Sequence, residues 1–130
     1  MPLPPVVAIC LGACAGALLR WRLGLWLNHA DAWLPWGTLA ANLLGGYLVG
    51  LVIGLLQQWP QLDPAWRLLL VTGFLGALTT FSSFSAEVLD MLLHQRWLQA
   101  AGTSALHLFG SLLLTWLGLQ SGTFLVAARA

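Results

Sequence analysis

The sequence predicts an all-α integral membrane protein with four transmembrane helices. Hydrophobic residues make up 59% of its 130 residues and charged residues only 7%, and the mean hydropathy is +0.84. A soluble domain needs far more charge on its surface, so this composition excludes one. Because a helix needs about 20 apolar residues to cross the hydrocarbon core, four such spans use nearly the whole length.

The first span is expected at about residues 4–27, with Arg20 and Arg22 near its far end. Asn28–Asp31 links it to a second span at about residues 33–57. Most tryptophans fall near expected span ends, where indole rings prefer the membrane interface. These are Trp21, Trp26, Trp33, Trp36, Trp59, Trp66 and Trp97.

The segment Gln58–Pro64 is the second connection, because its prolines end one helix and start the next. The third span is expected at about residues 65–93, and His94–Arg96 leads into an uncharged fourth span at about residues 97–127. These spans leave no room for a domain outside the membrane. We therefore expect residues 1–130 to form a single four-span domain.

Small residues recur at every fourth position in three of the spans. Such stripes let helix backbones approach closely in lipid, so they predict helix association and say nothing specific about transport. The stripes are Gly12-xxx-Gly16, Ala41-xxx-Gly45, Gly46-xxx-Gly50-xxx-Gly54 and Gly118-xxx-Gly122.

The third span contains the strongest conflict between local sequence and helix geometry. Gly73 and Gly76 lower helix propensity, and the β-branched pair Thr79 and Thr80 lowers it further within a few residues. We expect a break near Gly76 to Thr80, where free carbonyls are tolerated only inside protein or beside a cavity or ion site. The alternative is a continuous helix whose hydroxyls bond back to carbonyls one turn earlier.

Polar residues inside the spans are few, and each must be satisfied without water or line a wet cavity. Asn42 lies well inside the second span and offers two N–H donors. Phe81 and Phe84 share one helical face, with Thr80 and Ser83 beside them. Two ring edges turned toward a path could contact a small anion. The alternatives are an interhelical hydrogen bond for the amide and simple packing for the rings.

Orientation in the membrane follows the arginine and lysine bias of short loops. In the four-span arrangement Arg67 and Arg129 lie on the side of the termini, whereas Arg20, Arg22 and Arg96 lie on the other. Two arginines against three is nearly even, so the chain is expected to insert both ways. The natural closed assembly is then an antiparallel, dual-topology dimer with an isologous interface.

Three motifs in order resemble the Fluc (CrcB) family of small fluoride channels, and the resemblance covers nearly the whole chain. The matching segments are Gly12–Trp21, Gly37–Gly45 with Gly50, and Gly73–Ser85. The resemblance implies fluoride-selective, passive efflux from the cytoplasm through a multi-pass protein of the bacterial inner (plasma) membrane. It also implies an antiparallel homodimer with two pores and a structural sodium ion at the dimer centre.

The resemblance assigns roles to particular residues. Asn42 is the expected pore-lining amide, Phe81 and Phe84 are the ring pair, and Thr80 and Ser83 add hydroxyl donors. The remaining assignments are Gly76 and Thr79 as carbonyl ligands of sodium, and Arg20 in a vestibule or bracing the dimer.

The fourth span departs from the family pattern, which usually has a tyrosine followed one turn later by a serine. Here Thr103, His107 and Ser111 form an i, i+4, i+8 stripe. We include His107 and Ser111 among the pore candidates. A buried neutral histidine satisfied by a neighbour is the alternative for His107.

Other functions fit the sequence less well. A small multidrug-type proton-coupled exporter needs a buried carboxylate in the first span, which has none. A non-transporting accessory protein leaves Asn42 and the phenylalanine pair unexplained. Glu87, Asp90 and His94 match no zinc or nucleophile pattern and are expected at a solvated helix end, so an enzyme is not indicated. The absence of lysine and of a basic patch argues against nucleic acid as a partner and leaves lipid and a second copy of the chain.

Overall fold

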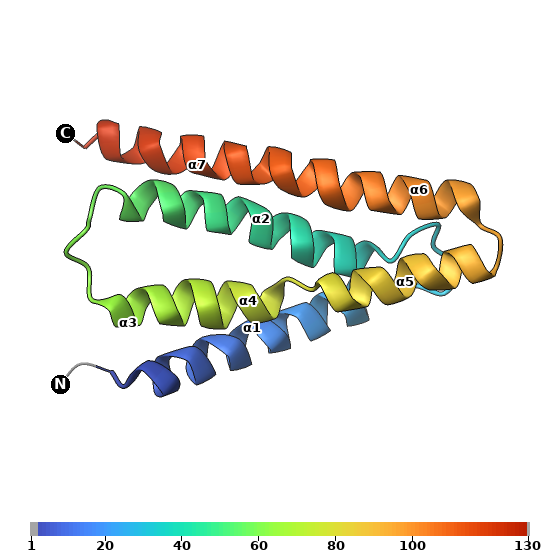
Figure 1. Cartoon of the computed structure of the whole chain (residues 1–130), viewed down its shortest axis with the longest axis horizontal. Coiled ribbons are helices and arrows are strands. Elements are labelled where there is room, and N and C mark those ends of the chain that lie inside the picture. Colours follow the sequence, from blue (N-terminus) through green and yellow to red (C-terminus); the bar gives the residue numbers. More distant parts are fainter. Residues whose placement is uncertain (1–2, 130) are drawn as a thin grey trace.

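The computed structural model describes residues 3–129, and these residues are all-helical (Figure 1). Four helical stretches are long and apolar enough to cross a membrane, as predicted. The first two are single helices, α1 at Pro5–Leu27 and α2 at Trp36–Leu56. The third and fourth, at Pro64–Leu93 and Trp97–Ala127, are each built from several segments.

The third stretch is not one regular helix but a series of segments. It begins as α3 (Pro64–Arg67), continues as a π-helical segment (Leu68–Leu75) and ends its first half as α4 (Gly76–Leu78). The second half, α5, spans Phe81–Leu93.

Between α4 and α5 the backbone is extended. Thr79 has φ −82° and ψ 150°, and Thr80 has φ −149° and ψ 114°. The connection is visible as a thin, non-helical yellow trace between α4 and α5 (Figure 1). Both residues are β-branched and so favour extended backbone, which places the interruption at this pair.

The fourth stretch is helical throughout. It consists of α6 (Trp97–Ala105), a π-helical segment (Leu106–Gly110) and α7 (Ser111–Ala127). A π-helical turn inside an α-helix changes the direction in which the following side chains point, and such turns are frequent at functional sites.

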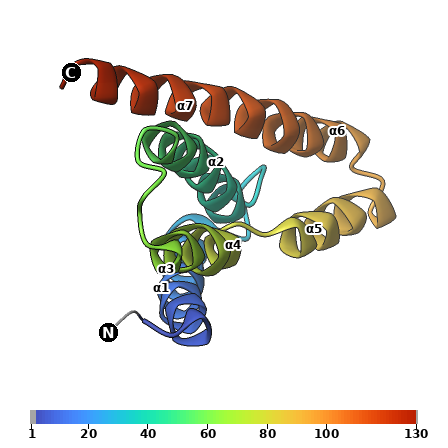
Figure 2. The same cartoon turned by 60° about the vertical axis from the view of Figure 1, so that its left-hand side comes forward.

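Close packing joins the helices in two pairs. A Cβ built on Gly16 of α1 would lie 2.1 Å from Phe74 O, and one built on Gly12 would lie 2.1 Å from Leu69 O. A Cβ on Gly50 of α2 would lie 2.0 Å from Thr115 O of α7. The glycine stripes therefore put α1 against the first half of the third stretch and α2 against α7. The second half of the third stretch, α5, packs against α6 and also contacts α2 (Figure 2).

The connection before α2 differs from the expected one. The second span starts at Trp36, three residues later than residue 33, because the Asn28 side chain folds the loop back. Asn28 Oδ1 accepts a hydrogen bond from Gly37 N at 2.6 Å. This loop brings the end of α1 beside the start of α2, next to the interruption in the third stretch.

Candidate functional site at the helix interruption

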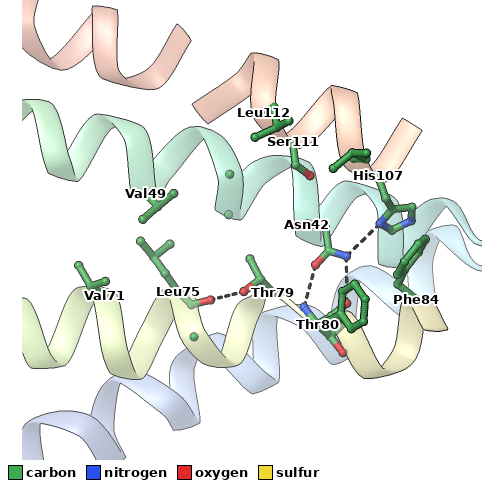
Figure 3. Close-up of a pocket in the computed structure, with 15 residues that line it drawn as sticks. Asn42, Val49, Val71, Leu75, Thr79, Thr80, Phe84, His107, Ser111 and Leu112 are labelled. Carbon is green, nitrogen blue, oxygen red and sulfur yellow. Dashed lines mark hydrogen bonds between the residues drawn. The ribbon is translucent and has the colours of Figure 1, made fainter. Parts of the chain in front are cut away.

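Asn42 of α2 hydrogen-bonds to the backbone N–H and C=O of Thr80, the extended residue before α5. Its Oδ1 accepts from Thr80 N at 2.7 Å, and its Nδ2 donates to Thr80 O at 3.0 Å. The same Nδ2 lies 3.0 Å from His107 Nδ1 on the fourth stretch (Figure 3). One amide thus connects three transmembrane stretches, and both of its N–H groups are engaged by the protein.

Two carbonyls at the interruption lose the donors that a continuous helix would give them. Thr80 N would bond to Gly76 O but bonds to Asn42, and Ser83 N would bond to Thr79 O but donates to Thr80 Oγ1 at 3.1 Å. Gly76 and Thr79 are the two residues to which the family resemblance assigns the sodium ligands. The Thr79 hydroxyl donates to Leu75 O, one turn earlier, at 2.8 Å. This bond was expected for a continuous helix, but here it forms beside the interruption.

The Thr80 hydroxyl caps the first turn of α5. It accepts from Ser83 N and donates to Ser83 Oγ at 3.1 Å. Because Thr80 is 9% exposed, this hydroxyl satisfies one of the unpaired N–H groups of the helix start in a place with little water.

Three rings follow one another beside the amide. The ring centroids of Phe81 and Phe84 are 5.4 Å apart at an interplanar angle of 57°, and Phe84 lies 4.5 Å from the His107 ring. His107 is only 6% exposed, whereas Phe81 is 79% exposed. The rings therefore lead from the surface of this chain inward to the imidazole.

A cavity of about 520 Å³ lies along these groups (Figure 3). Eight of the ten predicted site residues line it: Asn42, Gly76, Thr79, Thr80, Phe81, Phe84, His107 and Ser111. Its other walls are apolar or glycine, and its lining contains no formally charged side chain when His107 is neutral.

Ser83 does not share a wall with the phenylalanines, contrary to the prediction. It lines a second cavity of about 340 Å³ together with Arg20. Consecutive residues of an α-helix point about 100° apart, so a serine directly before Phe84 faces away from the ring. Thr80 lines both cavities and is the residue at which they meet.

Arg20 holds the end of α4. Its Nε donates to Ala77 O at 2.9 Å, which satisfies a carbonyl next to the interruption. A cation at a helix C-terminus is also favoured by the helix dipole. The contact therefore ties α1 to a backbone carbonyl of the neighbouring helix beside the interruption.

Glu87 is not the solvated helix-end residue that was expected. Its Oε1 accepts a hydrogen bond from Thr38 Oγ1, and its Oε2 is buried with no partner within residues 3–129. Both residues line the second cavity. A carboxylate inside an otherwise apolar span is itself a signal of function, and it could have been followed from the sequence. Asp90 and His94 are exposed, as expected.

Fold and site together define a small polytopic membrane protein with an uncharged, largely apolar cavity beside a helix interruption. The chain belongs to the CrcB family: the family model described as CrcB-like protein, Camphor Resistance (CrcB), matches residues 7–119.

Several relatives resemble the chain over nearly its whole length. A protein of Albidiferax ferrireducens is 65% identical over 122 residues, which cover 94% of this chain and 93% of the relative. One of Variovorax paradoxus is 63% identical over 123 residues, covering 95% and 98%, and one of Paracidovorax citrulli is 57% identical over 122 residues, covering 94% and 96%. Each relative carries the name "Fluoride-specific ion channel FluC". The family resemblance seen in the sequence is confirmed.

Proposed function

We propose that this chain forms a fluoride-selective channel that gives passive fluoride efflux from a bacterial cytoplasm. The observation that carries the proposal is the cavity at the interruption, where an amide, hydroxyls, an imidazole and two phenylalanine rings meet without a formal charge. Membership of the CrcB family and the names of the relatives support it. A channel catalyses no reaction, so no enzyme chemistry is assigned.

The path must replace the water that fluoride loses on entry. The Ser111 hydroxyl, the Asn42–His107 pair and the edges of Phe81 and Phe84 can each replace part of that shell. The Thr80 hydroxyl can do so when its single hydrogen turns from Ser83 Oγ toward the ion. Ser83 adds a hydroxyl on the side of the second cavity. Chloride is larger and accepts weaker hydrogen bonds, so a narrow path of this kind excludes it.

The active form is an antiparallel homodimer in the inner membrane. The nearly even distribution of arginine, two against three, supports both insertions. Large apolar side chains on the outer faces, such as Phe81 at 79% and Phe109 at 67% exposure, are suited to contact with lipid or with a second copy.

A structural sodium ion at the dimer centre fits the chemistry of the interruption. The carbonyls of Gly76 and Thr79 lack their helical donors, and both residues line the cavity. Uncharged oxygens of this kind are ligands for a hard cation. Such an ion would supply a fixed positive charge that lowers the electrostatic barrier for a passing anion. Arg20 braces the interruption and lines the second cavity as a vestibule residue.

Fluoride efflux from proteoliposomes, followed with a fluoride electrode, tests the proposal. Asn42→Asp, Phe81→Ile and Phe84→Ile should each lower the rate, whereas Phe124→Ile should leave it unchanged. Phe124 is 72% exposed and lines neither cavity, so it is a matched control. Vesicles loaded with chloride should not discharge. Undiminished fluoride flux in all three cavity variants would remove the pore assignment.

A further inference from the structure

Every hydrogen of the Asn42 amide is used inside the protein. The side-chain NH2 has two hydrogens, and its partners are Thr80 O and His107 Nδ1, both at 3.0 Å. The amide cannot be turned round, because Oδ1 accepts from Thr80 N at 2.7 Å and a flip would set two donors against each other. In this arrangement Asn42 has no spare donor for an ion.

This bonding fixes the tautomer of His107. Because Nδ1 accepts from the amide, it carries no hydrogen, and a neutral imidazole then carries its hydrogen on Nε2. Within residues 3–129, Nε2 has no hydrogen-bond partner, and less than 1 Å² of the atom is exposed. The imidazole therefore has one N–H donor that is buried beside the cavity and has no hydrogen-bond partner in this chain. Burying an unpaired donor is unfavourable unless an acceptor binds to it.

The ring of Phe84 packs against the imidazole, with 4.5 Å between the two ring centroids. Phe84 is partly buried and lines the same cavity (Figure 3).

We propose that His107 Nε2–H is a specificity-determining donor for the permeating anion, and that Asn42 is the positioning residue that keeps the hydrogen on that nitrogen. This inference deepens the proposed fluoride channel and rests on it. Fluoride accepts a stronger hydrogen bond than chloride, so one desolvated N–H favours fluoride. Asn42 then acts through His107 without touching the ion.

Nitrogen NMR spectra of protein labelled at its histidines test the tautomer directly. The chain has three histidines, and the His107→Gln variant assigns the His107 signals by their loss. We expect Nε2 protonated and Nδ1 unprotonated in the wild type. In Asn42→Asp the carboxylate can only accept, so Nδ1 must carry a hydrogen, and where the ring stays neutral Nε2 loses its own. A merely structural role of Asn42 would not move this signature.

Addition of sodium fluoride should shift the His107 Nε2 signal, and sodium chloride at equal concentration should not. The signals of His29 and His94, which lie outside the cavity, serve as internal controls. In Asn42→Asp the fluoride-induced shift should disappear.

Flux measurements use two substitutions that separate the donor from the ring. Glutamine can accept from Asn42 through its oxygen and offer an N–H near the place of Nε2, so His107→Gln should conduct within a few-fold of the wild type. His107→Phe keeps a ring against Phe84 but has no donor, so its flux should fall about tenfold or more, the loss expected for a hydrogen bond to an ion. Should the phenylalanine variant fail to fold, the glutamine variant and the spectra still decide.

The outcomes separate the two proposals. The inference about His107 is overturned if wild-type vesicles conduct fluoride but fluoride does not shift the His107 signals. It is also overturned if the wild-type imidazole carries its hydrogen on Nδ1. Wild-type vesicles that conduct no fluoride overturn the channel itself.

Discussion

Thr80 is bound to its surroundings through its peptide and through its hydroxyl, and a substitution can separate the two. Thr80→Val keeps the branched shape and the peptide bonds to Asn42 but removes the cap on Ser83 N. Loss of such a cap should destabilise the protein by about 1 kcal/mol. The measurement is the thermal unfolding midpoint in detergent. Thr80→Ser keeps the hydroxyl and should unfold near the wild-type midpoint; a valine variant as stable as the wild type would contradict the cap.

The sequence predicts which residues form the site better than it predicts the hydrogen bonds between them. Asn42, Phe81 and Phe84 are recognisable because an amide and an i, i+3 ring pair stand out in apolar helices. That Asn42 is bonded to both Thr80 and His107 depends on two other stretches, so it is not a property of local sequence. The same holds for Glu87 and Thr38, which are 49 residues apart.

At the scale of elements, the contact between α2 and α7 depends on glycine. A Cβ on Gly50 would lie 2.0 Å from Thr115 O, which is a backbone atom that cannot move aside. Gly50→Ala should therefore cost about 1–3 kcal/mol or prevent folding, as overpacking does. The readout is recovery of a monodisperse protein and its unfolding midpoint.

Gly24→Ala is the matched control for this substitution, because its Cβ would meet only Asn28 Nδ2 at 3.7 Å. It should be neutral or raise the stability by up to about 1 kcal/mol, since alanine favours a helix over glycine. Equal effects of the two alanines would show that close backbone approach is not what holds α2 against α7.

The four spans follow from hydropathy, because lipid demands a continuous apolar stretch of fixed length. The helix break near Gly76 to Thr80 can also be predicted from the sequence, because glycine and β-branched residues both lower helix propensity there. The π-helical segments Leu68–Leu75 and Leu106–Gly110 are not visible in the same way. Their composition is ordinary for a membrane helix, so their geometry depends on packing between stretches.

The same limit applies to Arg20. Its place near the end of the first span suggests a capping role, but the partner is set by the packing of α1 against α4. Once Gly12 and Gly16 bring the backbones together, the guanidinium reaches Ala77 O and supports the interruption from the side opposite Asn42. Small residues in one helix thus determine which carbonyls of another remain free.

At the scale of the whole molecule, the cavity alone does not explain conduction. Phe81 is 79% exposed on a single chain, so the outer end of the ring series has no wall from its own protomer. A second copy inserted in the opposite sense supplies that wall in the proposed dimer. In the proposed dimer, conduction therefore requires chains of both membrane orientations. The difference in arginine number between the two sides of the membrane is the property to change in order to test this.

Orientation can be biased with substitutions in exposed connections. Gln58→Arg and Gln61→Arg combined with Arg22→Gln places more arginine on the side of the termini, and Ala30→Arg with Arg67→Gln does the reverse. By the positive-inside rule, each set should hold the chain in one orientation, which a reporter fused to the C-terminus detects. Either set alone should give fluoride flux near background, because only parallel pairs can form. Co-expression of the two sets should restore flux. A variant that shows one orientation and still conducts at the wild-type rate by itself would contradict the antiparallel dimer. Such a result would leave unchanged the proposal that fluoride passes along the cavity residues.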